Sequence, residues 1–211
     1  YNSPWNIAAD FDVNMSFSVD EIAVMLREYE EDSHTGMNIQ EVSQQIYGYT
    51  SGYPYLVSRL CKSLDERVPR SNGFERLDLV WTKEGITEAV KLLLKENTPL
   101  FDSLVKQLDI YEDLRKVIED LLYQGKSIPF SMQVKSINLG FMFGFLKEEN
   151  GRVAMANRIF EMVLLNVFKT DHQRCRELVS GSTDQGRKEN GCYRRLPRRA
   201  VCGGIEDLAR E

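Results

Sequence analysis

Few residues in this chain combine the types and spacing that catalysis or metal binding requires. The only histidines, His34 and His172, lie far apart in sequence, which does not favour a histidine-based catalytic triad. His172, Cys175, Cys192 and Cys202 are ligand types for zinc, but the paired C-x-x-C spacing typical of zinc sites is absent. No Gly-x-x-x-x-Gly-Lys-Ser/Thr phosphate loop or dinucleotide-binding glycine pattern occurs either. The sequence therefore predicts no catalytic residue and no metal site.

Residues 47–56, Tyr-Gly-Tyr-Thr-Ser-Gly-Tyr-Pro-Tyr-Leu, could contact a nucleotide. Pro54 marks the start of a helix, because the first helical turn tolerates a missing amide hydrogen. The positive end of that helix and the aromatic face of Tyr53, beside Gly52, would suit the base or sugar of a nucleotide held elsewhere. A tight turn between two helices, covered by tyrosines, explains the same residues equally well. The sequence leaves both interpretations open.

Composition limits the class of protein to which the chain can belong. Its 211 residues include 27 basic and 32 acidic side chains, a formal charge of −5, and suffice for one large domain or two small ones. Collagen-like, wholly disordered and disulfide-stapled classes are excluded, and no run of about 18 apolar residues could span a bilayer. Cysteine use fits a reducing cytoplasm. Because the chain starts without Met or a signal peptide, we expect it to be part of a longer protein.

The first half of the sequence predicts helices preceded by one short strand. Apolar side chains alternate with polar ones over residues 11–17, which is typical of a half-buried strand. Capping boxes that begin at Ser18 and Asn38 predict two helices, and Gly48 is expected to close the second. The helix that starts at Pro54 has a continuous apolar face, on which Cys61 is interpreted as a small core residue.

Two more helices complete this predicted bundle. Residues 69–81 are expected to form a polar loop. Thr82 is a suitable N-cap for the next helix, and Pro99 begins the one after it. Up to about residue 108, the chain therefore reads as an all-helical bundle.

From about residue 109 the order of elements changes to that of a winged-helix domain. A helix ends at Gly125, an extended piece follows at 127–130, and a second short helix comes next. Asn150-Gly151 between two apolar runs predicts a β-hairpin, since both central residues of a type I′ turn need positive φ. Asn157 is expected to cap a final helix.

The charge of the winged-helix segment favours a protein contact over DNA binding. Residues 132–146 contain a single cation, Lys135, among many apolar side chains. A helix that reads a DNA groove needs Lys, Arg, Asn or Gln directed at phosphates and base edges. Glu148 and Glu149, at the predicted hairpin tip, would repel phosphate.

Four stretches of the chain resemble a known protein family. They are SPWNIAADF at 3–11, MSFS at 15–18, YTSGYPYLV at 49–57 and NRIFE at 157–161. Together they are similar to bacterial AAA-like P-loop ATPases related to the archaeal ATPase and STAND groups, and the likeness covers about residues 1–170. In that family a nucleotide-binding core is followed by a helical lid and a winged-helix-like domain, and many members end in a PD-(D/E)xK nuclease-like domain.

The resemblance implies a nucleotide-binding role for the lid. Gly52, Tyr53 and Pro54 match the glycine-proline element that closes over the base, and Arg59, one turn further on, resembles an arginine that senses the γ-phosphate. The Walker A, Walker B and sensor elements would lie upstream of Tyr1. ATP and Mg would accordingly bind the full-length parent, with no tight cofactor binding expected of this chain alone.

The tail differs from the rest of the chain. Residues 171–211 contain nine Lys and Arg and seven Asp and Glu, so they carry +2 whereas residues 1–170 carry −7. Suitable codons for residues 190–210, read one nucleotide later, spell a segment that resembles the nuclease-like domain of this family, including its Glu-x-Lys. We therefore interpret residues 171–211 as an out-of-frame, disordered tail, a hypothesis that the nucleotide sequence of the gene tests.

These expectations combine into a mainly α fold, a helical lid bundle followed by a winged-helix-like module with a small β-hairpin. The predicted parts are a remnant of the nucleotide-binding core at 1–17, the lid at 18–108, the winged-helix-like domain at 109–170 and the tail at 171–211. The resemblance implies ATP binding coupled to the winged helix, with no catalysis by these residues alone. The alternative is a non-enzymatic interaction module. Expected partners are the missing ATPase core and protein partners or a second copy, rather than nucleic acid or a membrane.

Overall fold

The computed structural model describes residues 16–96 and 98–181. Helices make up most of these residues, and two short strands among them pair in an antiparallel hairpin, so the predicted mainly α fold is confirmed. The chain divides into two compact units, one up to Leu164 and one from Leu165 onward. Among the described residues, no helix combines the length and the apolar character needed to span a bilayer.

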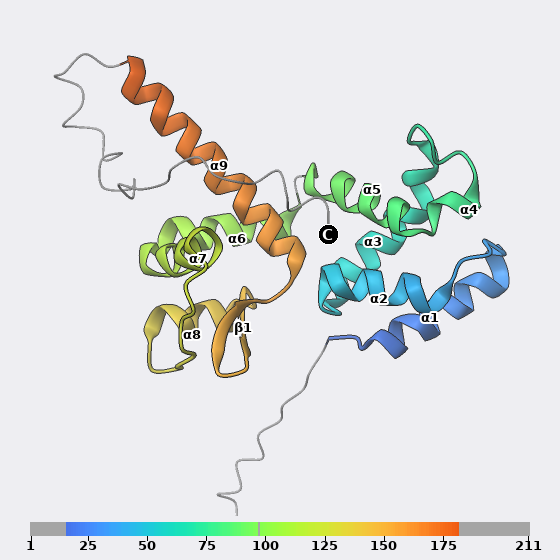
Figure 1. The fold of residues 1–211 in the computed structure, drawn as a ribbon, viewed down its shortest axis with the longest axis horizontal. Coiled ribbons are helices and arrows are strands. Elements are labelled where there is room, and N and C mark those ends of the chain that lie inside the picture. The colour runs from blue at the N-terminus through green and yellow to red at the C-terminus, as the bar shows by residue number, and fades with distance from the viewer. Residues whose placement is uncertain (1–15, 97, 182–211) are drawn as a thin grey trace, which may run out of the picture. The chain divides into compact units, whose positions relative to one another are not determined.

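The first unit begins with a bundle of helices built around α3 (Figure 1). On α3, the side chains of Leu56, Val57, Leu60 and Leu64 are fully buried, and each such side chain stabilises the fold by roughly 1.5–3 kcal/mol. The bundle consists of α1 (Val19–Ser33), α2 (Ile39–Thr50), α3 (Pro54–Glu66), the 3₁₀ turn η1 (Val68–Arg70), α4 (Leu77–Val80) and α5 (Lys83–Leu94).

The predicted starts of these helices are confirmed. The Ser18 hydroxyl accepts a hydrogen bond from the Glu21 amide at 3.2 Å, and the Ser18 amide donates to the Glu21 carboxylate at 2.7 Å. The hydrogen bond from the Ser18 amide, followed by one from the Ser18 hydroxyl, lowers the pKa of the Glu21 carboxyl. Asn38 caps α2 through the amide of Glu41, and Thr82 caps α5 in the same manner. The capping box predicted at Asn38 is only half formed, since the Glu41 carboxylate accepts from the Asn38 side chain and not from its backbone amide.

Two expectations for the bundle are wrong in detail. Gly48 does not close α2, which continues to Thr50, because the chain turns only where Ser51 and Gly52 adopt positive φ values of 46° and 73°. The segment at 69–81 is not simply a polar loop, since it contains part of η1 and all of α4. Burial of Trp81, which is 4% exposed, orders this segment against the bundle.

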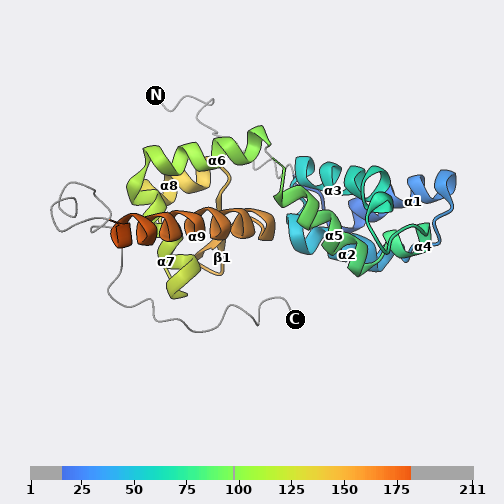
Figure 2. The same cartoon turned by 90° about the horizontal axis from the view of Figure 1, so that it is seen from above.

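The remaining elements of the first unit, which include only the start of α9, form a second group. α6 (Pro99–Ile110) packs against α7 (Glu112–Gln124), and α7 packs against α8 (Lys135–Met142) (Figure 2). The strands β1 (Leu146–Glu149) and β2 (Arg152–Met155) form the hairpin, and α9 (Arg158–Gly181) follows it. The sequence predicted α6 as the last helix of the lid, but its packing on α7 associates it with this second group.

The predicted hairpin is confirmed. Asn150 and Gly151 have φ values of 54° and 75°, as a type I′ turn requires, and Leu146 pairs with Met155 in the resulting register. The extended piece predicted at 127–130 pairs with β2 through a single bridge between Pro129 and Arg152. Helix, extended piece, helix and hairpin therefore follow one another in the order expected.

The predicted N-terminal strand and the predicted C-terminal tail both lie partly outside the described residues. Residues 1–15, with most of the strand expected at 11–17, lie outside them, as do residues 182–211 of the expected tail. α9 continues to Gly181, so residues 171–181, which were assigned to the tail, are helical.

Candidate functional site

The segment between α2 and α3, which carries the predicted nucleotide-binding residues, is a turn with its own hydrogen bonds. The Thr50 hydroxyl donates to the Ile46 carbonyl at 2.8 Å and accepts from the Gly52 amide at 3.1 Å. The Tyr53 amide donates to the Thr50 carbonyl at 3.0 Å. The amides of Gly52 and Tyr53 are thus used within the turn.

Gly52 is required by a close approach of two backbone segments. The Phe17 amide donates to the Gly52 carbonyl at 2.8 Å. A Cβ atom at position 52 would lie 1.9 Å from the Phe17 carbonyl oxygen, far inside contact distance, and the φ of 73° disfavours any other residue. The tight-turn interpretation therefore accounts for the glycine without a ligand, while Tyr53 and Pro54 require a separate account.

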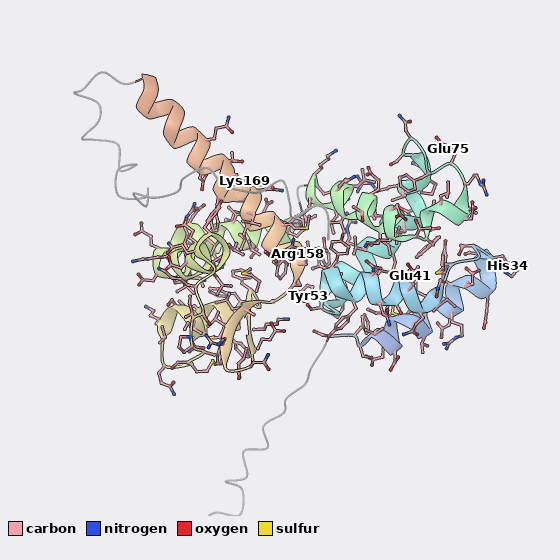
Figure 3. The ribbon with its side chains drawn as sticks, viewed as in Figure 1. His34, Glu41, Tyr53, Glu75, Arg158 and Lys169 are labelled. Atoms are coloured by element: carbon pink, nitrogen blue, oxygen red, sulfur yellow. The ribbon has the colours of Figure 1, made fainter. Side chains whose placement is uncertain are left out.

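The positive end of α3 has no capping side chain, whereas the Tyr53 ring beside it already contacts another ring. Pro54 is its first residue, and its N-cap, Tyr53, makes no side-chain capping bond, so the positive end of the helix lacks a capping side chain. The Tyr53 ring lies edge-on to the buried Phe160 ring, with centroids 5.8 Å apart. Figure 3 labels Tyr53 at this position, together with Arg158 at the start of α9. Tyr47 and Tyr55 are 38% and 39% exposed.

Arg59 does not extend freely into solvent, as a residue waiting for phosphate would. Its guanidinium pairs with the carboxylate of Glu96, which also pairs with Arg67. Glu96 is the most buried of the three, with its side chain 17% exposed. The structure therefore places Arg59 in a two-arginine cluster, about two turns of α3 away from Tyr53.

An open hollow of about 420 Å³ lies beside the end of α2. Its lining includes Gly48, Ser51 and residues of α7, the hairpin and α9. Its cations are neutralised locally, because Lys147 pairs with Glu149 at 3.6 Å and Arg158 with Glu161 at 2.6 Å. The hollow therefore offers no excess positive charge to phosphate.

The other residues considered for chemistry do not converge. His34 ends α1 in the left-handed conformation, and its Nδ1 lies 3.2 Å from the Glu30 carbonyl. Burial raises the pKa of the Cys61 thiol to about 11, so the thiol stays protonated at neutral pH. The side chain is only partly buried, so Cys61 is not one of the fully buried core residues that the sequence led us to expect. Among the described side chains, no group of three or more His, Cys, Asp or Glu could hold a metal ion. The side chains of His172, Cys175, Cys192 and Cys202 lie outside the described set.

The surface of α8 is apolar, as the sequence indicated. Phe141 and Met142 are 44% and 70% exposed, and Val134, just before the helix, is 44% exposed. Lys135 is the only cation on α8 itself. This face has the chemistry of a protein contact rather than of a DNA-reading helix.

Sequence reasoning missed two members of the arginine cluster, Arg67 and Glu96. Arg59 and Arg67 are eight residues apart on or next to α3, about two helical turns, so the sequence places them toward one side of the helix. Nothing in the sequence links them to Glu96, which is 37 residues from Arg59. The chain matches no protein-family model, no curated protein and no solved structure.

Proposed function

We propose that α1–α5 form the lid of an AAA-like ATP-binding protein and contribute contacts to a nucleotide that a separate core domain holds. The observation that carries this proposal is the start of α3, where a helix N-terminus without a capping side chain is combined with Tyr53 and Pro54. Such an end attracts the partial negative charge of a nucleotide, and the aromatic ring supplies a flat apolar face for the base or sugar.

The resemblance and the geometry assign complementary roles to the two parts. ATP and Mg would be bound and cleaved by the core, since this chain has no phosphate loop. The lid would respond to the nucleotide through Tyr53. Because the Tyr53 ring also contacts Phe160 at the start of α9, a change at Tyr53 would reach the winged-helix-like group directly.

We expect weak binding of Mg-ATP by the isolated chain, about two- to tenfold weaker in Tyr53→Ala, because the lost ring contact is worth roughly 0.5–1.5 kcal/mol. Pro54→Ala tests the helix start in the same way. Equilibrium dialysis with labelled nucleotide measures both, with circular dichroism to establish that each variant is folded. Tyr55→Ala is the matched control, since this tyrosine lies two residues away and its ring is exposed.

Two outcomes would contradict the proposal. One is an equal loss of binding in Tyr55→Ala and Tyr53→Ala, which would mean that the tyrosines act without positional specificity. The other is full-strength ATP hydrolysis by this chain alone, which would place the catalytic machinery within these residues.

The apolar face of α8 favours a second candidate function, in which the chain binds a protein and has no catalytic role. We propose that the partner is a second copy of the chain. The Met142 side chain is 70% exposed, and its removal from water in a contact would favour association. The winged-helix order alone would suggest DNA, but Lys135 is the only cation of α8.

Met142→Glu is expected to weaken self-association at least about tenfold, because it places a charge in an apolar contact. Sedimentation equilibrium at several protein concentrations measures this change. Ile110→Glu is the control, since Ile110 is comparably exposed, at 67% against 70%, at the end of α6. DNA binding that weakens steeply with salt, or a monomeric chain at all concentrations, would count against this candidate.

A further inference from the structure

The cluster of Arg59, Glu96 and Arg67 combines two cations with one anion. One carboxylate oxygen of Glu96 pairs with Arg59 and the other with Arg67. The side chains of the two arginines are 35% and 40% exposed, so a solute can reach them. The cluster carries a net charge of +1 and has the ligand set by which arginine pairs bind carboxylates and phosphates.

Glu96 occupies a position where its own helix does not favour a negative charge. It lies two residues after Leu94, the last residue of α5, and its amide donates to the Leu93 carbonyl at 3.1 Å, so its carboxylate is near the negative end of the helix dipole. The attraction that holds the carboxylate here comes from Arg59 and Arg67. An anion with more charge and more oxygens could therefore compete with it.

The cluster also contains hydrogen-bond capacity that Glu96 does not use. The Arg59 Nε atom and the Ser63 hydroxyl are buried and have no hydrogen-bond partner among the described residues. Ser63, itself 3% exposed, lies one turn after Arg59 on α3 and one turn before Arg67, which directly follows the helix, so the three positions follow one another along one side. A buried donor without a partner is costly, and a phosphate group has the additional oxygens to satisfy both groups.

We propose that Arg59, Ser63 and Arg67 form a phosphate-binding site that Glu96 occupies in the absence of ligand. A polyphosphate displaces the Glu96 carboxylate from the two arginines. The identity of the natural ligand as the phosphates of a nucleotide rests on the proposed function, whereas the competition between Glu96 and phosphate does not.

The test measures binding of inorganic tripolyphosphate to the full chain by isothermal titration calorimetry. Glu96→Gln keeps the size of the side chain but removes its charge, so we expect affinity to rise about tenfold. Asp78→Asn is the matched control, since it also removes one carboxylate paired with an arginine, at an exposed pair elsewhere in the bundle. The basic residues at 171–211 contribute equally in every variant.

Further variants separate a displaced carboxylate from an altered fold. Glu96→Asp keeps the charge on a shorter side chain, and we expect an affinity between those of the unchanged chain and Glu96→Gln. Combining Arg67→Lys with Glu96→Gln should abolish the gain, because lysine cannot form the bidentate contact. Circular dichroism establishes that each variant is folded.

The outcomes distinguish this proposal from the proposed function. Equal affinities in Glu96→Gln and Asp78→Asn, or a gain that survives the added Arg67→Lys, would overturn the phosphate site and leave the Tyr53 contact to stand on its own test. A tenfold gain in Glu96→Gln combined with no effect of Tyr53→Ala on Mg-ATP would support the phosphate site and reject the nucleotide contact at the start of α3.

Discussion

Gly52→Ala is expected to lower the free energy of unfolding by roughly 2–4 kcal/mol. The added Cβ atom would lie 1.9 Å from the Phe17 carbonyl oxygen, and the alanine would have to adopt a φ of 73°. Because the obstructing atoms are backbone atoms, relief requires the Phe17–Gly52 hydrogen bond to break, with the entry to α1 moving away from the turn. Urea unfolding followed by circular dichroism measures the loss.

Gly48→Ala is the matched control, and we expect it to raise the free energy of unfolding rather than lower it. Gly48 lies inside α2, where a Cβ atom would meet nothing within 4 Å. Alanine should therefore stabilise the helix by about 0.5–1 kcal/mol. Equal stabilities for Gly52→Ala and the unchanged chain would mean that the segment at Phe17 does not lie against the turn in solution.

Phe160→Ala is expected to lower the free energy of unfolding by about 3–5 kcal/mol, because it empties a fully packed site. Phe160 is 1% exposed, and its ring contacts those of Tyr53 and Phe145, with centroid distances of 5.8 Å and 6.4 Å. Phe141→Ala is the control, since the Phe141 ring is 44% exposed and makes one edge-on contact, with Phe130, so its loss should lower stability by no more than about 1.5 kcal/mol. Urea unfolding of both variants gives the comparison.

A double-mutant cycle extends this prediction to the contact that the proposed function uses. Changing Tyr53 and Phe160 to alanine, singly and together, should give a coupling energy of about 0.5–1.5 kcal/mol if the rings interact as in the structure. Additive effects would show that Tyr53 and the start of α9 are energetically independent, and would remove the proposed route from Tyr53 to α9.

Sequence alone predicted the features that depend on neighbours within a few residues. The hydrogen bonds between Ser18 and Glu21, and between Asn157 and the Phe160 amide, span three positions each, so residue types at that spacing are sufficient to indicate them. The hairpin at Asn150-Gly151 follows from the φ values that these two residues tolerate. Gly48 misled because a helix ends where the backbone finds a stable left-handed turn, and Ser51 and Gly52 provide it.

Only the tertiary structure decided what the candidate site residues contact. The need for glycine at position 52 comes from Phe17, which packing brings against the turn, and the partner of Arg59 is Glu96, at the end of another helix. Neither contact can be recognised from the nearby sequence, because each depends on how separate helices pack against one another. The sequence by itself determined the helices, the hairpin and the aromatic turn; the packing of α3 on α5 determined that Arg59 and Arg67 pair with a carboxylate of the chain itself.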